Sequence, residues 1–268
     1  NDFGGRKRFD AGHVENRIEP KRGTVQMGRT EVADSPIGVV HELGKGRTIL
    51  FNATPIGYMA SRSHGLGETM RSFFGQCVQM ARVKPELVVS KPGDDTPLPG
   101  LGIFPFRKGA DRYYGIAPDL HISQDVLGAM QMDAEGGQGV VTVAFPKAGH
   151  IYDVRKGEYL GKGKQVNVQL GTFDAPLFAV MKTRAKSMAL EFDGETATAK
   201  LEVSGGKPGE RVFRFDLVDS RGNRLLDRGA NVLTRRGGAS WTPGGRLPKN
   251  GTVVCRDVAT GVRAEVKL

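Results

Sequence analysis

The first clear pattern along the chain is a pair of apolar segments separated by a turn. Residues 37–43 and 47–52 are each rich in apolar side chains, and Gly44, Lys45 and Gly46 lie between them. Two such segments joined by a short glycine-containing turn predict a β-hairpin. Residues 1–36 mix charge and glycine without periodicity, so we expect an extended N-terminal arm there.

Residues 67–84 follow a helical pattern, because apolar side chains recur at intervals of three and four residues. These positions are Met70, Phe73, Phe74, Cys77, Val78 and Ala81. Pro85 is expected to end the helix. Residues 37–85 therefore make a partial α/β segment. Because the arm offers no covering layer, we expect another polypeptide to cover residues 37–84, either an upstream part of a precursor or a neighbouring copy in an oligomer.

After Pro85 the pattern changes to short strands separated by glycine, proline and aspartate turns. The predicted strands are residues 87–90, 102–107, 112–117, 121–123, 139–145, 150–153, 165–170 and 178–181. Short strands at this spacing indicate an antiparallel sandwich or barrel. We interpret residues 86–185 as a small β-sandwich domain.

Residues 186–268 contain about seven further short strands. Residues 211–218 alternate apolar and charged side chains, which is typical of a half-buried strand. This size and pattern predict an immunoglobulin-like sandwich. The expected fold class is therefore mainly β, with two antiparallel β-sandwich-like domains preceded by a partial α/β hairpin and helix.

Composition narrows the class of protein. Apolar residues make up 38% and charged residues 25%, as in a globular protein, and the 38 glycines suit a chain rich in turns. No apolar run approaches the roughly 18 residues that a membrane span needs. The chain neither begins with Met nor shows a signal peptide, which we interpret as a processed or trimmed N-terminus.

The net charge of +10 is concentrated in residues 221–256. The basic residues there are Arg221, Arg224, Arg228, Arg235, Arg236, Arg246, Lys249 and Arg256, against the single acid Asp227. Such a segment is either a solvated sheet face or an anion-binding surface for an acidic polysaccharide. We single out Arg235, Arg236 and Arg246 as candidate contacts. No recognition helix or set of aromatic side chains accompanies them, so nucleic acid is not expected.

Catalytic and metal chemistry find little support in the sequence. The five histidines show no zinc-binding spacing, and Cys77 and Cys255 are too few for a disulfide scaffold. The Gly44–Arg47 turn lacks the spacing of a phosphate loop. We expect no cofactor, no metal and no catalytic residue in this chain.

Three aromatic residues are candidates for stacking on a sugar ring: Tyr113, Tyr114 and Trp241. An aromatic face can lie flat on the apolar side of a pyranose. Neighbouring residues of a strand point to opposite faces, so at most one of the two tyrosines would be exposed. Packing in the core is the competing explanation for each of the three.

Three segments resemble parts of a known protein family. Residues 41–52 with the following helix resemble the end of the amidotransferase-like domain of glycoside hydrolase family 42 β-galactosidases. Residues 151–161 resemble the small β domain that follows it, and residues 251–266 resemble the last strands of appended immunoglobulin-like modules. This resemblance implies a secreted, periplasmic or cell-surface bacterial protein, in which the amidotransferase-like domain serves trimerisation.

The resemblance transfers no catalytic residue, because family 42 hydrolysis needs two carboxylates on an upstream barrel. We therefore expect a non-catalytic accessory or assembly portion of a secreted glycosidase-like protein, with weak polysaccharide binding as a candidate activity. Two alternatives remain open: a subunit or processed fragment of an active glycoside hydrolase whose barrel lies on another chain, and a structural component of the cell surface or matrix.

Overall fold

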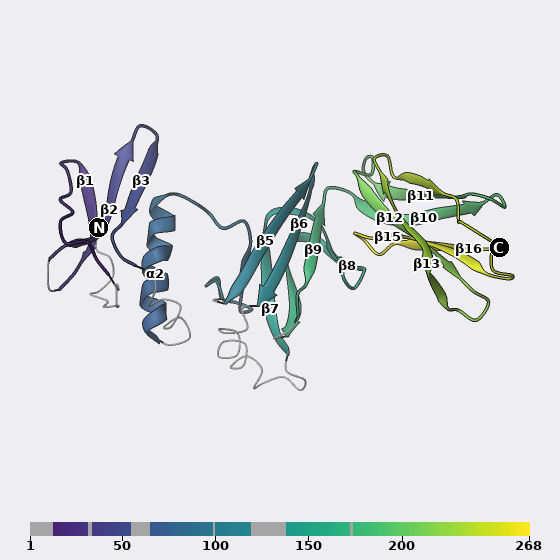
Figure 1. The fold of residues 1–268 in the computed structure, drawn as a ribbon, viewed down its shortest axis with the longest axis horizontal. Helices are drawn as coiled ribbons and strands as arrows, with labels where there is room; N and C mark the ends of the chain where they lie inside the picture. The colour runs from purple at the N-terminus through teal and green to yellow at the C-terminus, as the bar shows by residue number, and fades with distance from the viewer. Residues whose placement is uncertain (1–12, 32–33, 55–64, 99, 119–137, 172–173) are drawn as a thin grey trace. The chain divides into compact units, whose positions relative to one another are not determined.

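A computed structural model describes residues 13–31, 34–54, 65–98, 100–118, 138–171 and 174–268. The chain divides after Pro85 into two compact units, here called the N-terminal unit (residues 1–85) and the C-terminal unit (residues 86–268). The described part is mainly β, with antiparallel sheets and the helix α2 (Gly65–Met80) (Figure 1). None of its helices is long and apolar enough to cross a membrane.

The N-terminal unit contains a three-stranded antiparallel sheet in the order β1-β2-β3. Strands β2 (Pro36–Leu43) and β3 (Gly46–Phe51) form the predicted hairpin. Strand β1 (Thr24–Arg29) lies where the sequence suggested an irregular arm. Met27 is the buried side chain of this edge strand, so β1 carries almost no alternation by which a sequence pattern would reveal it.

Helix α2 packs on the sheet of its own unit. The ring of Phe51 lies 5.3 Å from the ring of Phe73 and 4.9 Å from that of Phe74. The helix ends before the expected position, because Arg82 adopts a left-handed conformation (φ 56°) and the Val83 N–H donates to the Val78 carbonyl at 3.1 Å. This closing turn ends the helix through its own hydrogen bonds rather than through Pro85.

The first module of the C-terminal unit is one six-stranded sheet, here called the bent sheet. Its strands are β4 (Val88–Ser90), β5 (Leu101–Lys108), β6 (Asp111–Pro118), β7 (Gln138–Asp153), β8 (Glu158–Gly171) and β9 (Leu177–Met181). Strand β7 pairs with β8 along its length but changes register between Ala144 and Gly149. Its first half also pairs with β4 and its second half with β9.

The bend in β7 lets the sheet enclose a core that contains Tyr114, Val143 and Phe178. Residues 139–145 and 150–153, which the sequence indicated as separate strands, are parts of this one bent strand. Gly149 lies at the bend, where a Cβ would come within 2.6 Å of Val180 Cγ1. The strand predicted at residues 121–123 lies outside the described residues.

The second module, here called the sandwich, consists of two antiparallel sheets in the orders β10-β11-β14 and β13-β12-β15-β16. Its strands are β10 (Arg184–Phe192), β11 (Ala197–Ser204), β12 (Arg211–Val218), β13 (Arg224–Thr234), β14 (Gly238–Trp241), β15 (Thr252–Asp257) and β16 (Arg263–Lys267). This is an immunoglobulin-like arrangement. Phe213, Phe215 and Leu217 of β12 are fully buried between the sheets.

The two modules share one apolar core. Tyr152, Ala179 and Met181 of the bent sheet belong to the same buried cluster as Phe213 of the sandwich. The backbone N–H of Ala185 donates to Tyr152 Oη at 2.9 Å, which anchors the start of β10 to the bent sheet. The bent sheet and the sandwich therefore pack together as one compact unit across the predicted domain boundary between residues 185 and 186.

Candidate functional site

A buried cluster of charges lies where the two modules of the C-terminal unit meet. Its centre is Arg211, the first residue of β12, which is 2% exposed. Because successive side chains of a strand alternate between faces, Arg211 points to the same side as Phe213 and Phe215, toward the core. An arginine on the buried face needs partners, since an unpaired charge is costly away from water.

Two carboxylates supply these partners from different modules. Arg211 Nη1 donates a hydrogen bond to Asp111 Oδ2, at the start of β6 in the bent sheet. Arg211 Nε lies 3.8 Å from Asp257 Oδ2, at the end of β15 in the sandwich. Thr260 Oγ1 donates to the same oxygen of Asp257 at 2.6 Å. We call Asp111, Arg211 and Asp257 the buried triad.

Burial and charge act in opposite directions on these groups. Burial raises the pKa of Asp257, although the Thr260 hydrogen bond and the nearby guanidinium act to lower it. Burial acts to lower the pKa of Arg211, but the hydrogen bond and charge of Asp111, with the charge of Asp257, raise it above its ordinary value. The guanidinium is therefore permanently charged, and it contacts a carboxylate of each module.

A second contact between the modules is made by two glycines. Gly157, in the turn after β7, lies against Gly261, in the turn before β16, and both have a positive φ (69° and 76°). A Cβ on Gly261 would come within 2.5 Å of Gly157 Cα. Only glycine at residue 261 allows the two backbones to approach so closely.

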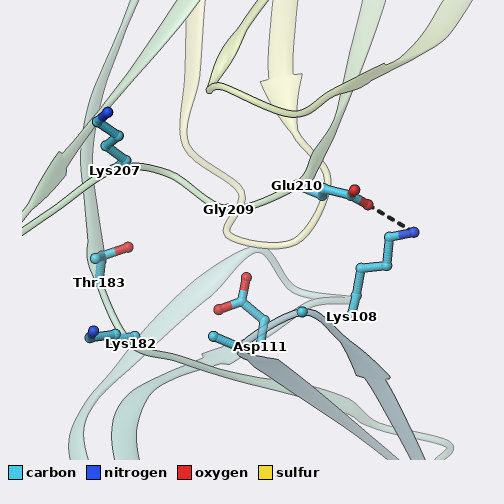
Figure 2. A pocket seen from close by; sticks show the side chains of 9 residues that line it. Lys108, Asp111, Lys182, Thr183, Lys207, Gly209 and Glu210 are labelled. Atoms are coloured by element: carbon cyan, nitrogen blue, oxygen red, sulfur yellow. Dashed lines mark ion pairs between the residues drawn. The ribbon is translucent and has the colours of Figure 1, made fainter.

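A cavity of about 280 Å³ adjoins the buried triad (Figure 2). Its lining residues are Lys108, Gly109, Ala110, Asp111, Lys182, Thr183, Lys207, Gly209 and Glu210. Lys108 Nζ lies 2.8 Å from Glu210 Oε2 in an ion pair, and Lys108 is the main reason why the pKa of Glu210 is lowered. Asp111 is held by Arg211.

This arrangement does not suit the acid–base chemistry of a glycosidase. Such a site needs one carboxyl group with a raised pKa that can reach the substrate. Among the described acidic side chains, the raised pKa belongs to Asp257, which is 0% exposed. Glu210 reaches the cavity, but its lowered pKa makes it a poor proton donor at neutral pH. The geometry of the cluster is that of a structural junction.

No family model and no curated protein matches this chain. An endonuclease/exonuclease/phosphatase structure from Beutenbergia cavernae is 10% identical, with a TM-score of 0.19, over 69% of this chain and 73% of that one. A β-glucuronidase from Ruminococcus gnavus is 11% identical, with a TM-score of 0.19, over 65% of this chain and 38% of that one. A β-glucuronidase structure from Dictyoglomus thermophilum is 10% identical, with a TM-score of 0.17, over 68% and 42%. Likenesses at these TM-scores carry no conclusion about fold or activity.

The three candidate sugar-stacking residues lie in three different packing environments. Tyr114 is 1% exposed in the core of the bent sheet. Tyr113 packs at the edge of the shared core, where burial raises its pKa and the charge of Arg211 acts to lower it. Trp241 is partly buried in the sandwich, with its ring 5.6 Å from that of Phe215. Core packing accounts for all three positions.

The three candidate anion-binding arginines do not converge either. Arg235 and Arg236 lie in the turn before β14, and Arg246 lies in the loop after it, so they flank opposite ends of a strand about 13 Å long. Arg235 Nε lies 3.8 Å from Glu210 Oε1. The carbonyl of Arg246 accepts a hydrogen bond from Arg228 at 2.7 Å.

The remaining polar candidates form no chemical site in the described structure. His13 and His41 belong to no described group of three or more His, Cys, Asp or Glu side chains able to hold a metal ion. Cys77 and Cys255 are free thiols, and burial raises the pKa of Cys255 to about 12. The buried triad was missed by the sequence patterns, although the spacing of Arg211 from Phe213 and Phe215 is a signal for an inward-facing arginine.

Proposed function

We propose that this chain is a non-catalytic structural portion of a larger secreted glycosidase-like protein, in which the C-terminal unit is a stiff spacer. The observation that carries the proposal is the buried triad, which joins the bent sheet to the sandwich through Arg211. A buried ion pair contributes little net stability, but it is satisfied only in one geometry. The triad therefore favours one relative orientation of the two modules.

Two further contacts support a fixed junction. The shared apolar core includes Tyr152 and Met181 from the bent sheet, and Gly157 lies against Gly261 at the turns. Contacts of three different kinds restrict the junction more than a flexible linker would. The resemblance of residues 37–268 to the C-terminal region of family 42 β-galactosidase-like proteins supports placing this spacer within such a larger protein.

Distances between spin labels test the proposed stiffness. We place one pair at Val140→Cys in β7 and Leu226→Cys in β13, which are 46% and 73% exposed, with Cys77 replaced by serine. A second pair at Leu226→Cys and Lys267→Cys lies within the sandwich. It serves as the reference, because the width of its distance distribution reports the motion of the labels alone. We expect both distance distributions to be equally narrow. A distribution across the junction much broader than that within the sandwich would contradict the spacer.

Assembly through the N-terminal unit is the second part of the proposal. Helix α2 covers the sheet face that contains Phe51, whereas Leu50 points to the opposite face and is 50% exposed. An exposed apolar side chain beside the buried Val39 is a place where another polypeptide can pack. The expected partner is a neighbouring copy or an upstream part of the same protein.

Sedimentation measures this assembly directly. We expect particles larger than the 28.9 kDa chain, and we expect Leu50→Glu to shift them toward the monomer, because a carboxylate is costly to bury. Leu226→Glu, at a more exposed position of the C-terminal unit, is the matched control and should leave the mass unchanged. A wild-type chain that sediments as a monomer argues against a neighbouring copy as the partner.

A further inference from the structure

The outer face of the four-stranded sheet of the sandwich carries three arginines in one row. Arg214 of β12 is the cross-strand partner of Arg256 of β15, and Arg256 is the partner of Arg263 of β16. On the other side of Arg214 the row continues to Asn231 of β13. The side chains share the outer face, because side chains alternate along a strand and the neighbouring Phe213, Phe215 and Cys255 are buried between the sheets.

This row places like charges next to one another, and of its three arginines Arg214 is paired with a carboxylate, that of Asp216. Directly opposed side chains on a sheet are about 4.5–5.5 Å apart at Cβ, and like charges in such positions destabilise the sheet. The side chains of Arg256 and Arg263 are exposed and form no ion pair or hydrogen bond with the described residues. The nearest acid on β16 is Glu265, which pairs with Val254 rather than with an arginine.

A single carboxylate orients the other arginines of this face. Asp216 Oδ1 lies 2.8 Å from Arg214 Nε and 2.7 Å from Arg224 Nη2. One negative charge shared by two guanidinium groups leaves the face positive. It also reduces the freedom of Arg214, whose side chain is 20% exposed, so part of the ordering cost of binding is met before any ligand arrives.

Several residues of this face, though not Arg263, border a shallow hollow of about 470 Å³. It is lined by Val212, Arg214, Arg224, Asn231, Arg256 and Val258. The two valines add apolar surface to the hollow, the amide of Asn231 can bond a hydroxyl group, and the three arginines supply positive charge. Guanidinium groups bind carboxylates through two parallel hydrogen bonds, which an ammonium group does not offer.

From these features we propose that the face formed by Arg214, Arg256 and Arg263 binds a carboxylated polysaccharide, a chain of uronic acid units. Adjacent strands are about 4.8 Å apart, so the row spans about 10 Å across three strands and can engage successive carboxylates of an extended polymer. The described residues of this face include no aromatic ring, which single-stranded nucleic acid binding normally uses to stack bases. The inference is independent of the stiffness of the junction.

The test uses the full chain and polygalacturonate as the probe, with binding measured by calorimetry at low and physiological salt. We expect binding that weakens as salt screens the exposed charges. The variant Arg256→Gln/Arg263→Gln should lose about tenfold in affinity, or about 1.4 kcal/mol, which is within the range for two exposed ion pairs. The variant Arg256→Lys/Arg263→Lys keeps the charge but not the two-bond geometry. Its affinity should lie between that of the wild-type chain and that of the glutamine variant.

The matched control is Arg235→Gln/Arg236→Gln, which removes the same charge from the turn before β14 and should change the affinity by less than about twofold. The fluorescence of Trp241 on thermal unfolding checks that each variant is folded. An equal loss of affinity for polygalacturonate in the two double glutamine variants would show a general effect of charge and overturn the proposed site. Absence of binding, or tighter binding of single-stranded oligothymidylate through the same arginines, would overturn it as well.

Discussion

Replacing Arg211 with alanine is expected to destabilise the C-terminal unit by about 3–5 kcal/mol, because it leaves buried carboxylates without their counter-charge. Asp257 is 0% exposed and Asp111 is 6% exposed, so neither side chain is well hydrated in the folded protein. The measurement is chemical denaturation followed by Trp241 fluorescence. Trp241 is the single tryptophan of the chain and packs near Phe215, so its signal reports the sandwich.

The pH dependence of this variant follows from the raised pKa of Asp257. Without the guanidinium, which acts to lower this pKa, the folded protein holds the proton of Asp257 up to a higher pH. When the pKa of a carboxyl group is higher in the folded than in the unfolded protein, the folded state loses stability as the pH rises from the unfolded pKa to the folded pKa. The deficit relative to wild type should therefore be smallest in acid and grow toward neutral pH.

Two further variants separate the loss of charge pairing from other causes. Adding Asp257→Asn to the Arg211→Ala variant should recover stability at neutral pH, because it removes the unpaired charge. Arg235→Ala removes an arginine that is 81% exposed and should change the stability by less than about 0.5 kcal/mol. If Arg211→Ala proves as mild as Arg235→Ala, the triad does not hold the junction.

Replacing Gly261 with alanine is expected to cost about 3 kcal/mol or more and to loosen the junction. The residue has a φ of 76°, which strains any side chain, and its Cβ would collide with backbone atoms of Gly157 that cannot rotate away. Strained backbone and overpacking each cost on the order of 1–3 kcal/mol. The melting temperature should fall, and the spin-label distance from β7 to β13 should broaden.

Gly222 provides the matched control for this substitution. It has a similar positive φ of 84° in a turn of the same sandwich, but a Cβ there would meet nothing within 4 Å. Gly222→Ala therefore measures the backbone strain alone, which is about 1–2 kcal/mol. If the two alanine variants are equally destabilised, the contact between Gly157 and Gly261 does not restrict the junction.

The mainly β class was confirmed, because strands with alternating side chains carry their own signal. Residues 213–217 alternate apolar and charged side chains, and strand β12 has the same bounds as the prediction. Strand β1 was missed, since its one buried side chain leaves no period to detect. Strand β7 was divided at a turn predicted over residues 147–149, and glycine often marks a turn, but Gly149 here accompanies a bend within a paired strand.

The candidate site was harder to predict than the fold, because its members are far apart in sequence. Asp111 and Arg211 are separated by 100 residues, and no local pattern links a turn aspartate to a strand arginine. The arginine row has the same difficulty. Arg214, Arg256 and Arg263 become neighbours only when the order β12-β15-β16 is known, whereas a count along the sequence favoured Arg235, Arg236 and Arg246.

The long separation between the partners of the buried triad also sets an order of events during synthesis. Asp111 leaves the ribosome 100 residues ahead of Arg211, an interval of about 5–20 s at ordinary rates of translation. The last strand of the bent sheet, β9, ends at Met181 and so emerges before Arg211, but Tyr152 and Met181 have no cover until the sandwich emerges. The nascent chain therefore carries an uncovered apolar surface beside a lone carboxylate, and the junction is the last part of the C-terminal unit to close.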